Sequence, residues 1–163
     1  VLSSCNDLDL SPTNNFTELT YWKTTEQASA VLSMAYSQMF GADYFWANER
    51  LTDNLYEDRG NTSEKTIVTG LANAATSRFS DEWKKCYEGI KSCHTFLENV
   101  DRVPGMDEAL RERMKAEARY IRASLFFRLA CHYGDVPLFE KSLTQQEANE
   151  ITRTAKATVI DFV

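Results

Sequence analysis

Residues 115–138 read KAEARYIRASLFFRLACHYGDVPL, and this stretch decides the fold class of the chain. Its apolar residues recur at the spacing of one helix face, and in the second half they extend nearly all round the helix axis, as in a buried helix. Gly134 and then Pro137 follow, an order typical of a helix end. The stretch predicts a long helix over residues 107–133. Its apolar face consists of Leu110, Met114, Ala118, Ile121, Leu125, Leu129 and His132, and Ala123, Phe126, Phe127 and Ala130 broaden it.

A second long helix is predicted just before the first. Residues 80–83 read SDEW, which is typical of a helix start, and Pro104 with Gly105 breaks the chain between the two helices. Helix, short turn and helix form a hairpin of the tetratricopeptide type, although one pair does not establish a repeat. The inward face is expected to hold Trp83, Tyr87, Ile90, Leu97 and Val100, with Cys86, Cys93 and His94 close to it.

Further helices are predicted on both sides of this hairpin. Thr24 and Gln27 fit a capping box, so we expect a helix from there to Gly41. Another helix should begin near Thr144 or Thr154 and run to the last residue. The small number of Gly (6) and Pro (3) in 163 residues also favours an all-α fold. The expected apolar faces are Ala28, Val31, Leu32, Ala35, Tyr36 and Met39 in the first helix, and Ala157, Ile160 and Val163 in the last.

Charge and hydropathy exclude two classes of partner from our expectations. The formal net charge is −6, and the 18 basic residues are scattered, so we expect no nucleic-acid partner, since phosphate binding depends on clustered Lys and Arg. No stretch approaches the roughly 18 continuous apolar residues that a membrane-spanning helix needs.

Three of the four cysteines lie in the predicted helices. Cys86 and Cys93 are seven residues apart, which separates their Cα atoms by roughly 10 Å along a helix, too far for a disulfide. Cys131 could meet one of them if the helices pack together. The simplest interpretation is that all three are small buried hydrophobic residues. We expect no metal site at Cys93-His94 or Cys131-His132, because neighbouring helix residues point about 100° apart.

The first five residues, VLSSC, resemble the lipobox at which bacterial lipoproteins are processed. Cys5 would then carry lipid, and each buried methylene would contribute about 0.8 kcal/mol to anchoring. The polar residues that follow suggest that 1–17 is a signal-peptide remnant and tether. The alternative is an ordinary N-terminus with a chance match.

The longest motifs resemble the SusD/RagB family of outer-membrane lipoproteins. Residues 116–123, AEARYIRA, and 133–138, YGDVPL, match the family's characteristic helix and its exit. The preceding helix, WKKCYEGIKSCHTFLENV at 83–100, matches as well, except that His94 stands where the family commonly has Asn. The helix containing Ala35-Tyr36 also fits.

The residues of the motif have a structural explanation that needs no ligand. Glu117 can form local ion pairs with Arg113 or Arg119, each worth a few tenths of a kcal/mol. Arg119 and Arg122 are expected to reach carbonyls or carboxylates of neighbouring helices. We therefore interpret the motif as a marker of the fold and not as a binding site.

The resemblance implies a cell-surface, glycan-binding lipoprotein that is anchored by lipid in the outer membrane. Such proteins capture an oligosaccharide or polysaccharide and pass it to a SusC-like TonB-dependent transporter, and they need no cofactor. Residues 18–163 would form the N-terminal helical domain of a SusD-like fold, truncated on its C-terminal side.

The ligand site is expected in residues 42–59. Aromatic rings stack on the apolar faces of sugars, while amides and carboxylates bind their hydroxyls. The candidate platforms are Tyr44, Trp46 and Tyr56, and the candidate hydrogen-bonding residues are Asn48, Asp53, Asn54 and Asp58. The alternative is that Phe45 and Trp46 belong to the core and that the acids are only solvated.

The alternatives to glycan binding are a scaffold for peptides or proteins and an enzyme. The helical hairpin alone would also suit a repeat scaffold that binds peptides or proteins, as in RagB-like peptide uptake. An enzyme is not expected, because no motif places a pair of carboxylates, and because His94 and His132 lie within helix faces without a nucleophile motif near them.

Overall fold

A computed structural model describes residues 21–39, 41–56, 60 and 62–163 of the chain. The predicted all-α fold is confirmed: within these residues the β-type pairing is a single bridge between Val136 and Thr154. The described elements are α2 (Thr25–Met39), α3 (Ala42–Glu49), α4 (Ser63–Val68), α5 (Ser77–Asn99), the 3-10 turn η1 (Val100–Arg102), α6 (Glu108–Tyr133), α7 (Gln145–Glu150) and α8 (Lys156–Phe162).

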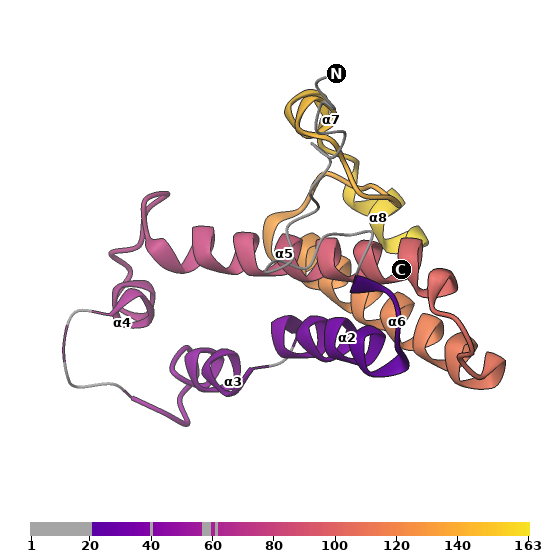
Figure 1. Cartoon of the computed structure of the whole chain (residues 1–163). Helices are drawn as coiled ribbons and strands as arrows, with labels where there is room; N and C mark the ends of the chain where they lie inside the picture. Colours follow the sequence, from indigo (N-terminus) through magenta and orange to yellow (C-terminus); the bar gives the residue numbers. More distant parts are fainter. Residues whose placement is uncertain (1–20, 40, 57–59, 61) are drawn as a thin grey trace, which may run out of the picture.

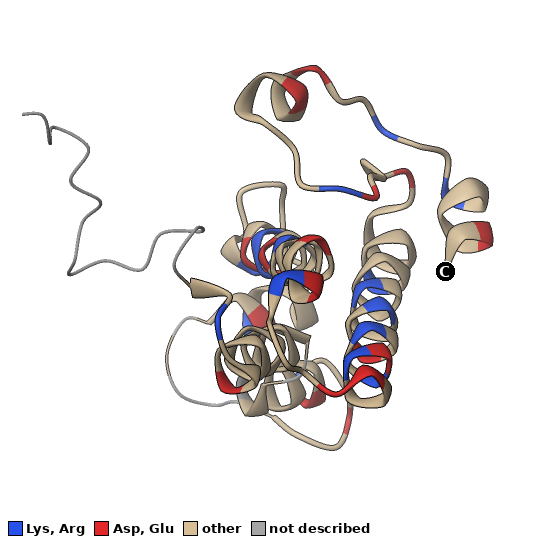
Figure 2. Cartoon of the chain, turned by 45° about the vertical axis from the view of Figure 1, so that its right-hand side comes forward, with Lys and Arg blue, Asp and Glu red and all other residues tan. Residues whose placement is uncertain are grey.

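The helices form a bundle with an arm on one side and a C-terminal segment on another. Helices α2, α5 and α6 pack against one another, and α8 packs on α6. The arm consists of α3 and α4 and extends away from the bundle (Figure 1). Charged residues of both signs are interspersed over the helices (Figure 2). None of the described helices is long and apolar enough to cross a membrane.

The predicted hairpin is confirmed in α5 and α6. The turn between them contains Gly105 with a φ of 66°, a left-handed conformation that favours glycine. Asp107 caps α6 by accepting a hydrogen bond from the Leu110 amide at 2.8 Å. Arg111 closes the turn by donating to the Val103 carbonyl at 3.1 Å. These contacts stabilise the chain reversal between α5 and α6.

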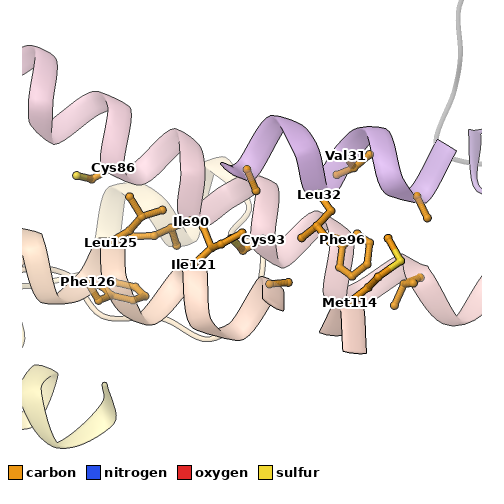
Figure 3. Packing of buried hydrophobic residues seen from close by; sticks show 14 of the residues in the cluster. Val31, Leu32, Cys86, Ile90, Cys93, Phe96, Met114, Ile121, Leu125 and Phe126 are labelled. Atoms are coloured by element: carbon orange, nitrogen blue, oxygen red, sulfur yellow. The ribbon is translucent and has the colours of Figure 1, made fainter. Parts of the chain in front are cut away.

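The core lies where α2 covers the hairpin (Figure 3). Ile90 of α5 lies beside Ile121 and Leu125 of α6, and Phe96 lies farther along the hairpin, beside Met114 (Figure 3). The side chains of Ile90, Phe96, Ile121 and Leu125 have no exposed surface. Gly89 allows the two helices to approach closely, because a Cβ placed there would lie 2.6 Å from a methyl carbon of Leu125. The residues predicted for this face therefore meet in one core.

Helix α2 starts with the predicted capping box. The Gln27 side chain accepts from the Thr24 amide at 3.1 Å, and the Thr24 hydroxyl oxygen accepts from the Gln27 amide at 3.3 Å. Tyr36 was predicted on the buried face but is 40% exposed, and its hydroxyl donates to Glu117 at 3.1 Å. Glu117 also pairs with Arg113 at 3.4 Å, as expected of residues four apart on a helix.

Expectations about burial were also wrong in α6 and α8. Cys131 is exposed and Phe127 is 50% exposed, because the C-terminal half of α6 is covered on two sides, by α5 and α8, and not all round. In α8 the buried residue is Val159, with Phe162 packed beside it, while Ile160 is 39% exposed. That helix contacts α6 through a face rotated by about one residue, roughly 100°, from the predicted one.

Two boundaries also differ from the predictions. Helix α5 begins at Ser77, three residues earlier than expected. Helix α4 lies in a stretch for which no helix was predicted. One C-terminal helix was expected, beginning near Thr144 or Thr154, but the structure has two helices there, α7 and α8. Thr144 forms a capping box with Glu147 at the start of α7, and α8 begins shortly after Thr154.

Cys86 and Cys93 are buried free thiols, as predicted. Burial raises the pKa of the Cys86 thiol to about 11 and that of Cys93 to about 12, so both stay protonated and behave as hydrophobic residues.

Candidate functional site

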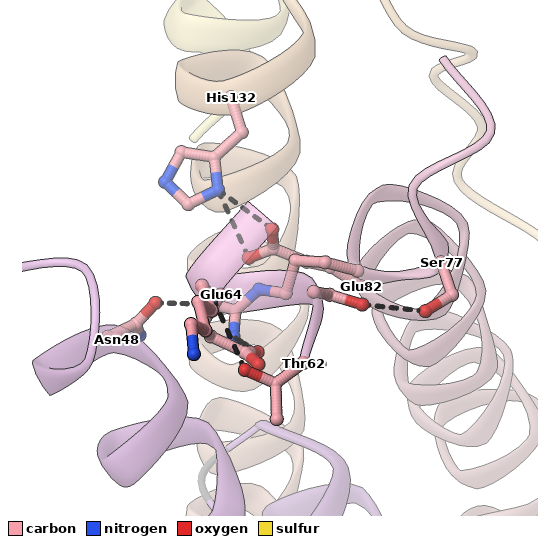
Figure 4. A network of polar contacts seen from close by, with 9 residues as sticks. Asn48, Thr62, Glu64, Ser77, Glu82 and His132 are labelled. Carbon is pink, nitrogen blue, oxygen red and sulfur yellow. Dashed lines mark hydrogen bonds and ion pairs between the residues drawn. The ribbon is translucent and has the colours of Figure 1, made fainter. Parts of the chain in front are cut away.

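The arm that carries most of the predicted ligand residues is held to the bundle by Arg78. This residue of α5 donates to the Asn48 side chain of α3 at 2.6 Å and to the Glu64 carboxylate of α4 at 3.0 Å (Figure 4). The Arg78 and Glu64 side chains are only 10% and 12% exposed. Because the hydrogen bonds are charge-assisted and largely shielded from water, this clamp fixes both arm helices relative to α5.

A second arginine holds the start of the arm. Arg128 of α6 donates to the Met39 carbonyl at the end of α2, at 2.7 Å. Its guanidinium carbon also lies 3.8 Å from the ring centroid of Tyr44, a close cation–π contact. The 115–138 stretch, interpreted above as a marker of the fold, therefore also orients one of the predicted ligand residues.

A cavity of about 360 Å³ lies between the arm and the bundle. Its wall combines the Tyr44 ring with charges of both signs, from Glu64, Arg78, Asp81, Glu82 and Lys85. The Glu82 carboxylate is 9% exposed and accepts from Nδ1 of His132, which lies 3.0 Å and 3.1 Å from its two oxygens. The pair joins α5 to α6 at the edge of the cavity (Figure 4).

The structure brings some of the predicted ligand residues together and separates others. Tyr44 lines the 360 Å³ cavity and Asn48 is bound to Arg78 beside it. Asp53 and Asn54 lie on the outer surface of the arm. Tyr56 is 72% exposed and lines a small separate cavity of about 30 Å³ against α4. Asp58 and Cys5 lie outside the described residues.

The alternative that Phe45 and Trp46 are core residues is wrong. They are 48% and 53% exposed and contact each other edge to face, with ring centroids 5.3 Å apart. An exposed aromatic pair on the arm is suited to contact a ligand or a partner, because it presents apolar surface to solvent without a packing role.

A larger cavity of about 470 Å³ lies elsewhere, between α5 and residues 137–151. Trp83 and Tyr87 of α5 line it together with Phe139, which follows the YGDVPL stretch. Sequence reasoning placed Trp83 and Tyr87 on the core face. It missed the cavity because the opposite wall comes from an irregular segment about 50 residues away, which helical periodicity does not describe.

His94 forms part of the wall of this larger cavity and is 1% exposed. Neither ring nitrogen has a hydrogen-bond partner among the residues that the structure describes. Burial, with a smaller contribution from the nearby Arg122 cation, lowers the pKa of His94 to about 4, so the imidazole is neutral at physiological pH. Arg122 reaches the carbonyl of Glu140 at 3.4 Å and stacks over Phe162, as expected of a partly buried arginine.

Within the described ranges, no three His, Cys, Asp or Glu side chains come together as a group that could hold a metal ion. The 360 Å³ cavity is lined by three carboxylates, of Glu64, Asp81 and Glu82, together with Arg78 and Lys85.

Comparison with known proteins identifies the family. Residues 8–163 match the model of the SusD-like_3 family, described as starch-binding associating with outer membrane. SusD-like protein P38 of Formosa agariphila is 24% identical over all of this chain, and P25 of the same organism is 28% identical over 76% of it. The chain spans 33% and 23% of the length of these two relatives.

Solved structures agree with the sequence relatives. A SusD-like carbohydrate binding protein from Bacteroides fragilis superposes on 88% of this chain with a TM-score of 0.73 and 29% identity, and 30% of that protein is covered. A SusD superfamily protein from Bacteroides thetaiotaomicron shares the fold, with a TM-score of 0.69 at 20% identity. The family model, the relatives and the fold agree, and the chain belongs to the SusD-like family.

Proposed function

We propose that this chain is part of a surface glycan-binding lipoprotein that captures an oligosaccharide or polysaccharide and passes it to a SusC-like TonB-dependent transporter of the outer membrane. The observation that carries the proposal is the family match over residues 8–163, whose description combines starch binding with the outer membrane. The role proposed for the protein is binding and delivery without catalysis.

The exposed face of the arm is the proposed place of contact with the glycan. Trp46 and Tyr56 present aromatic surface to solvent, and Asp53 and Asn54 lie exposed in the segment between them. Tyr44 lines the adjoining cavity, Asn48 is bound to Arg78, which lines it as well, and Asp58 lies outside the described residues. Aromatic faces with amides and carboxylates nearby match the apolar and hydroxyl-bearing faces of a sugar ring.

Glycan binding is tested with the full-length protein on gels that contain soluble starch, laminarin or polygalacturonate. We expect retardation by at least one polymer, and we expect Trp46→Ala to weaken that binding about tenfold, as is typical of an aromatic contact residue. Tyr120→Ala is the matched control, because Tyr120 is 64% exposed on α6, away from the arm. Equal loss in both variants, or no loss in either, would contradict the proposed contact surface.

The lipid anchor is tested separately by metabolic labelling with a radioactive fatty acid in the native host. The wild-type protein should incorporate label and sediment with the outer membrane, while Cys5→Ala should do neither. Cys131→Ala is the control, because it removes an exposed cysteine that has no proposed lipid. Label retained in Cys5→Ala would refute the anchor at this residue.

The transporter partner is tested by affinity purification of the tagged protein from detergent-solubilised outer membranes. We expect a TonB-dependent barrel to co-purify in comparable amount, whether or not glycan is present. Recovery of the protein without any such barrel would contradict the delivery role and leave glycan binding standing.

A further inference from the structure

The 470 Å³ cavity between α5 and residues 137–151 has a continuous aromatic wall. Trp83 and Tyr87 are four residues apart on one face of α5, and their ring centroids are 5.0 Å apart. The Phe139 ring continues the wall, since it lies nearly parallel to Tyr87, with an angle of 15° and a centroid distance of 5.8 Å. Three rings from two segments therefore line one side of a space large enough for a small organic ligand.

The opposite wall is fixed in place, so the cavity is preformed. The Tyr87 hydroxyl donates to the Pro137 carbonyl at 2.9 Å, and the Glu98 carboxylate accepts from the Ser142 amide at 2.6 Å. Beyond these contacts, Val136 and Thr154 form a two-way backbone pair at 3.1 Å and 2.9 Å. A site held open in this way costs a ligand little ordering of the protein.

Lys91 and Ser142 contribute polar side chains to the lining of the cavity. The Lys91 side chain is exposed, and no ion pair is formed by its ammonium within the described residues. The His94 ring belongs to the interior wall, where its nitrogens are closed off from solvent, so it contributes apolar surface and no charge at neutral pH.

We propose that this cavity is a second saccharide subsite, in which a sugar ring stacks on Trp83 and Tyr87 and its hydroxyls are bound by Lys91. The ligand class rests on the function proposed above, while the location rests on the geometry of the cavity. An aromatic wall beside a few hydrogen-bonding groups suits a ring that is apolar on its faces and polar at its edge. A purely apolar ligand would leave the Lys91 ammonium without a role.

The cavity lies on a different part of the molecule from the arm. Trp46 belongs to the arm, and Trp83 belongs to the 470 Å³ cavity. Substituting one of the two residues therefore tests one surface without changing the other. A long polysaccharide that contacts both surfaces gains affinity through multivalency, whereas a short oligosaccharide can occupy only one of them. The proposal therefore predicts that the contribution of the cavity persists when Trp46 is replaced.

The test uses the full-length protein and the polymer that retards the wild type, followed by calorimetric titration with its heptasaccharide. We expect Trp83→Leu to weaken binding about tenfold and Lys91→Ala about threefold, on the scale usual for contact residues. Lys84→Ala is the matched control, because Lys84 is exposed on the same helix but does not line the cavity. Thermal unfolding verifies that Trp83→Leu still folds, and Lys91→Ala changes only an exposed side chain.

Accessibility is measured in the same protein by maleimide labelling of Lys91→Cys, read out by peptide mass spectrometry. We expect labelling that slows at least fivefold when the heptasaccharide is bound. Unchanged affinity in both Trp83→Leu and Lys91→Ala would overturn the subsite and leave the proposed function intact. A thiol that never labels would also overturn it, since another part of the protein would then cover the cavity. Failure of every polymer to bind the wild type would instead contradict the proposed function.

Discussion

The α5–α6 hairpin and the α3–α4 arm are held together by different physical forces. In the hairpin, buried apolar side chains such as Ile90, Phe96 and Leu125 interlock along two long helices. In the described part of the arm no comparable cluster is buried, and helix α4 has no buried residue. It depends instead on two arginines, Arg78 and Arg128, which reach out from the bundle. The difference indicates a rigid scaffold beside a surface whose position is set by a few polar contacts.

The largest expected effect is in the hairpin. Leu125→Ala removes a fully buried side chain where α5 and α6 approach most closely, so the free energy of unfolding should fall by about 2–5 kcal/mol. Urea unfolding monitored by far-UV circular dichroism measures the change. A loss below about 1 kcal/mol would show that the interface is less tightly packed than the structure indicates.

The next largest effect is a dependence of the free energy of unfolding on pH, caused by His94. The unfolded chain binds a proton on His94 near its ordinary pKa of 6.5, whereas the folded protein binds it only near pH 4. The free energy of unfolding should therefore fall as the pH drops from 6.5 to 4, by about 3 kcal/mol from this residue alone.

The control for this prediction is His94→Leu, which replaces the unpartnered imidazole by an apolar side chain of similar size. We expect the variant to be at least as stable as the wild type at pH 7 and to lose less stability toward pH 4. Parallel pH profiles for the two proteins would show that folding does not lower the pKa of His94.

An intermediate effect is expected where the arm joins the bundle. Arg78→Met leaves the Glu64 carboxylate and the Asn48 amide without their partner, a loss of about 1–3 kcal/mol in local stability. Hydrogen exchange should accelerate in α3 and α4 and stay unchanged in α6. Faster exchange throughout the bundle would show that the arm and the hairpin unfold as one unit. That result would contradict the distinction between a rigid hairpin and an arm held by a few polar contacts.

A smaller effect should follow from the contact of Arg128 with Tyr44. A double-mutant cycle with Arg128→Met and Tyr44→Leu should give a coupling of about 0.5–2 kcal/mol in the opening of α3, measured by hydrogen exchange. Arg119→Met on the same helix is a suitable control, because Arg119 is exposed and distant in sequence from the pair. Strict additivity would mean that the cation–π contact does not hold the arm.

The smallest effect on stability should come from the exposed aromatic pair. Trp46→Ala is expected to change the free energy of unfolding by less than about 0.5 kcal/mol, because the side chain is 53% exposed. Thermal unfolding checks this. A large loss of stability would show that the Trp46 side chain packs against the rest of the protein and is not available to contact a ligand.

The sequence predicted the hairpin well because its signals are local. Helical spacing and the Pro104-Gly105 break both act within a few residues, and they locate α5 and α6 to within three residues. Which side of a helix is covered depends on distant elements, and for that reason the burial of Cys131 and the inward face of α8 were predicted wrongly.

The candidate site was less predictable for the same reason. The stretch 42–59 could be recognised by its mixture of aromatic and polar residues, and its first part forms α3. Nothing in that stretch indicates that Arg78 and Arg128 would hold it. The cavity at Trp83 could not be predicted from the sequence either, because Phe139 and the segment after it reach α5 only in the folded chain.

The most direct test of the account is hydrogen exchange of the full-length protein with and without a bound oligosaccharide. The account predicts slower exchange in residues 42–56 of the arm and in residues 83–91 and 137–143 around the cavity, with no change on the outer face of α6 at residues 113–127. Protection confined to the α6 face, or no protection in any of these segments despite saturating ligand, would contradict the claim that the arm and the cavity are where this chain binds glycan.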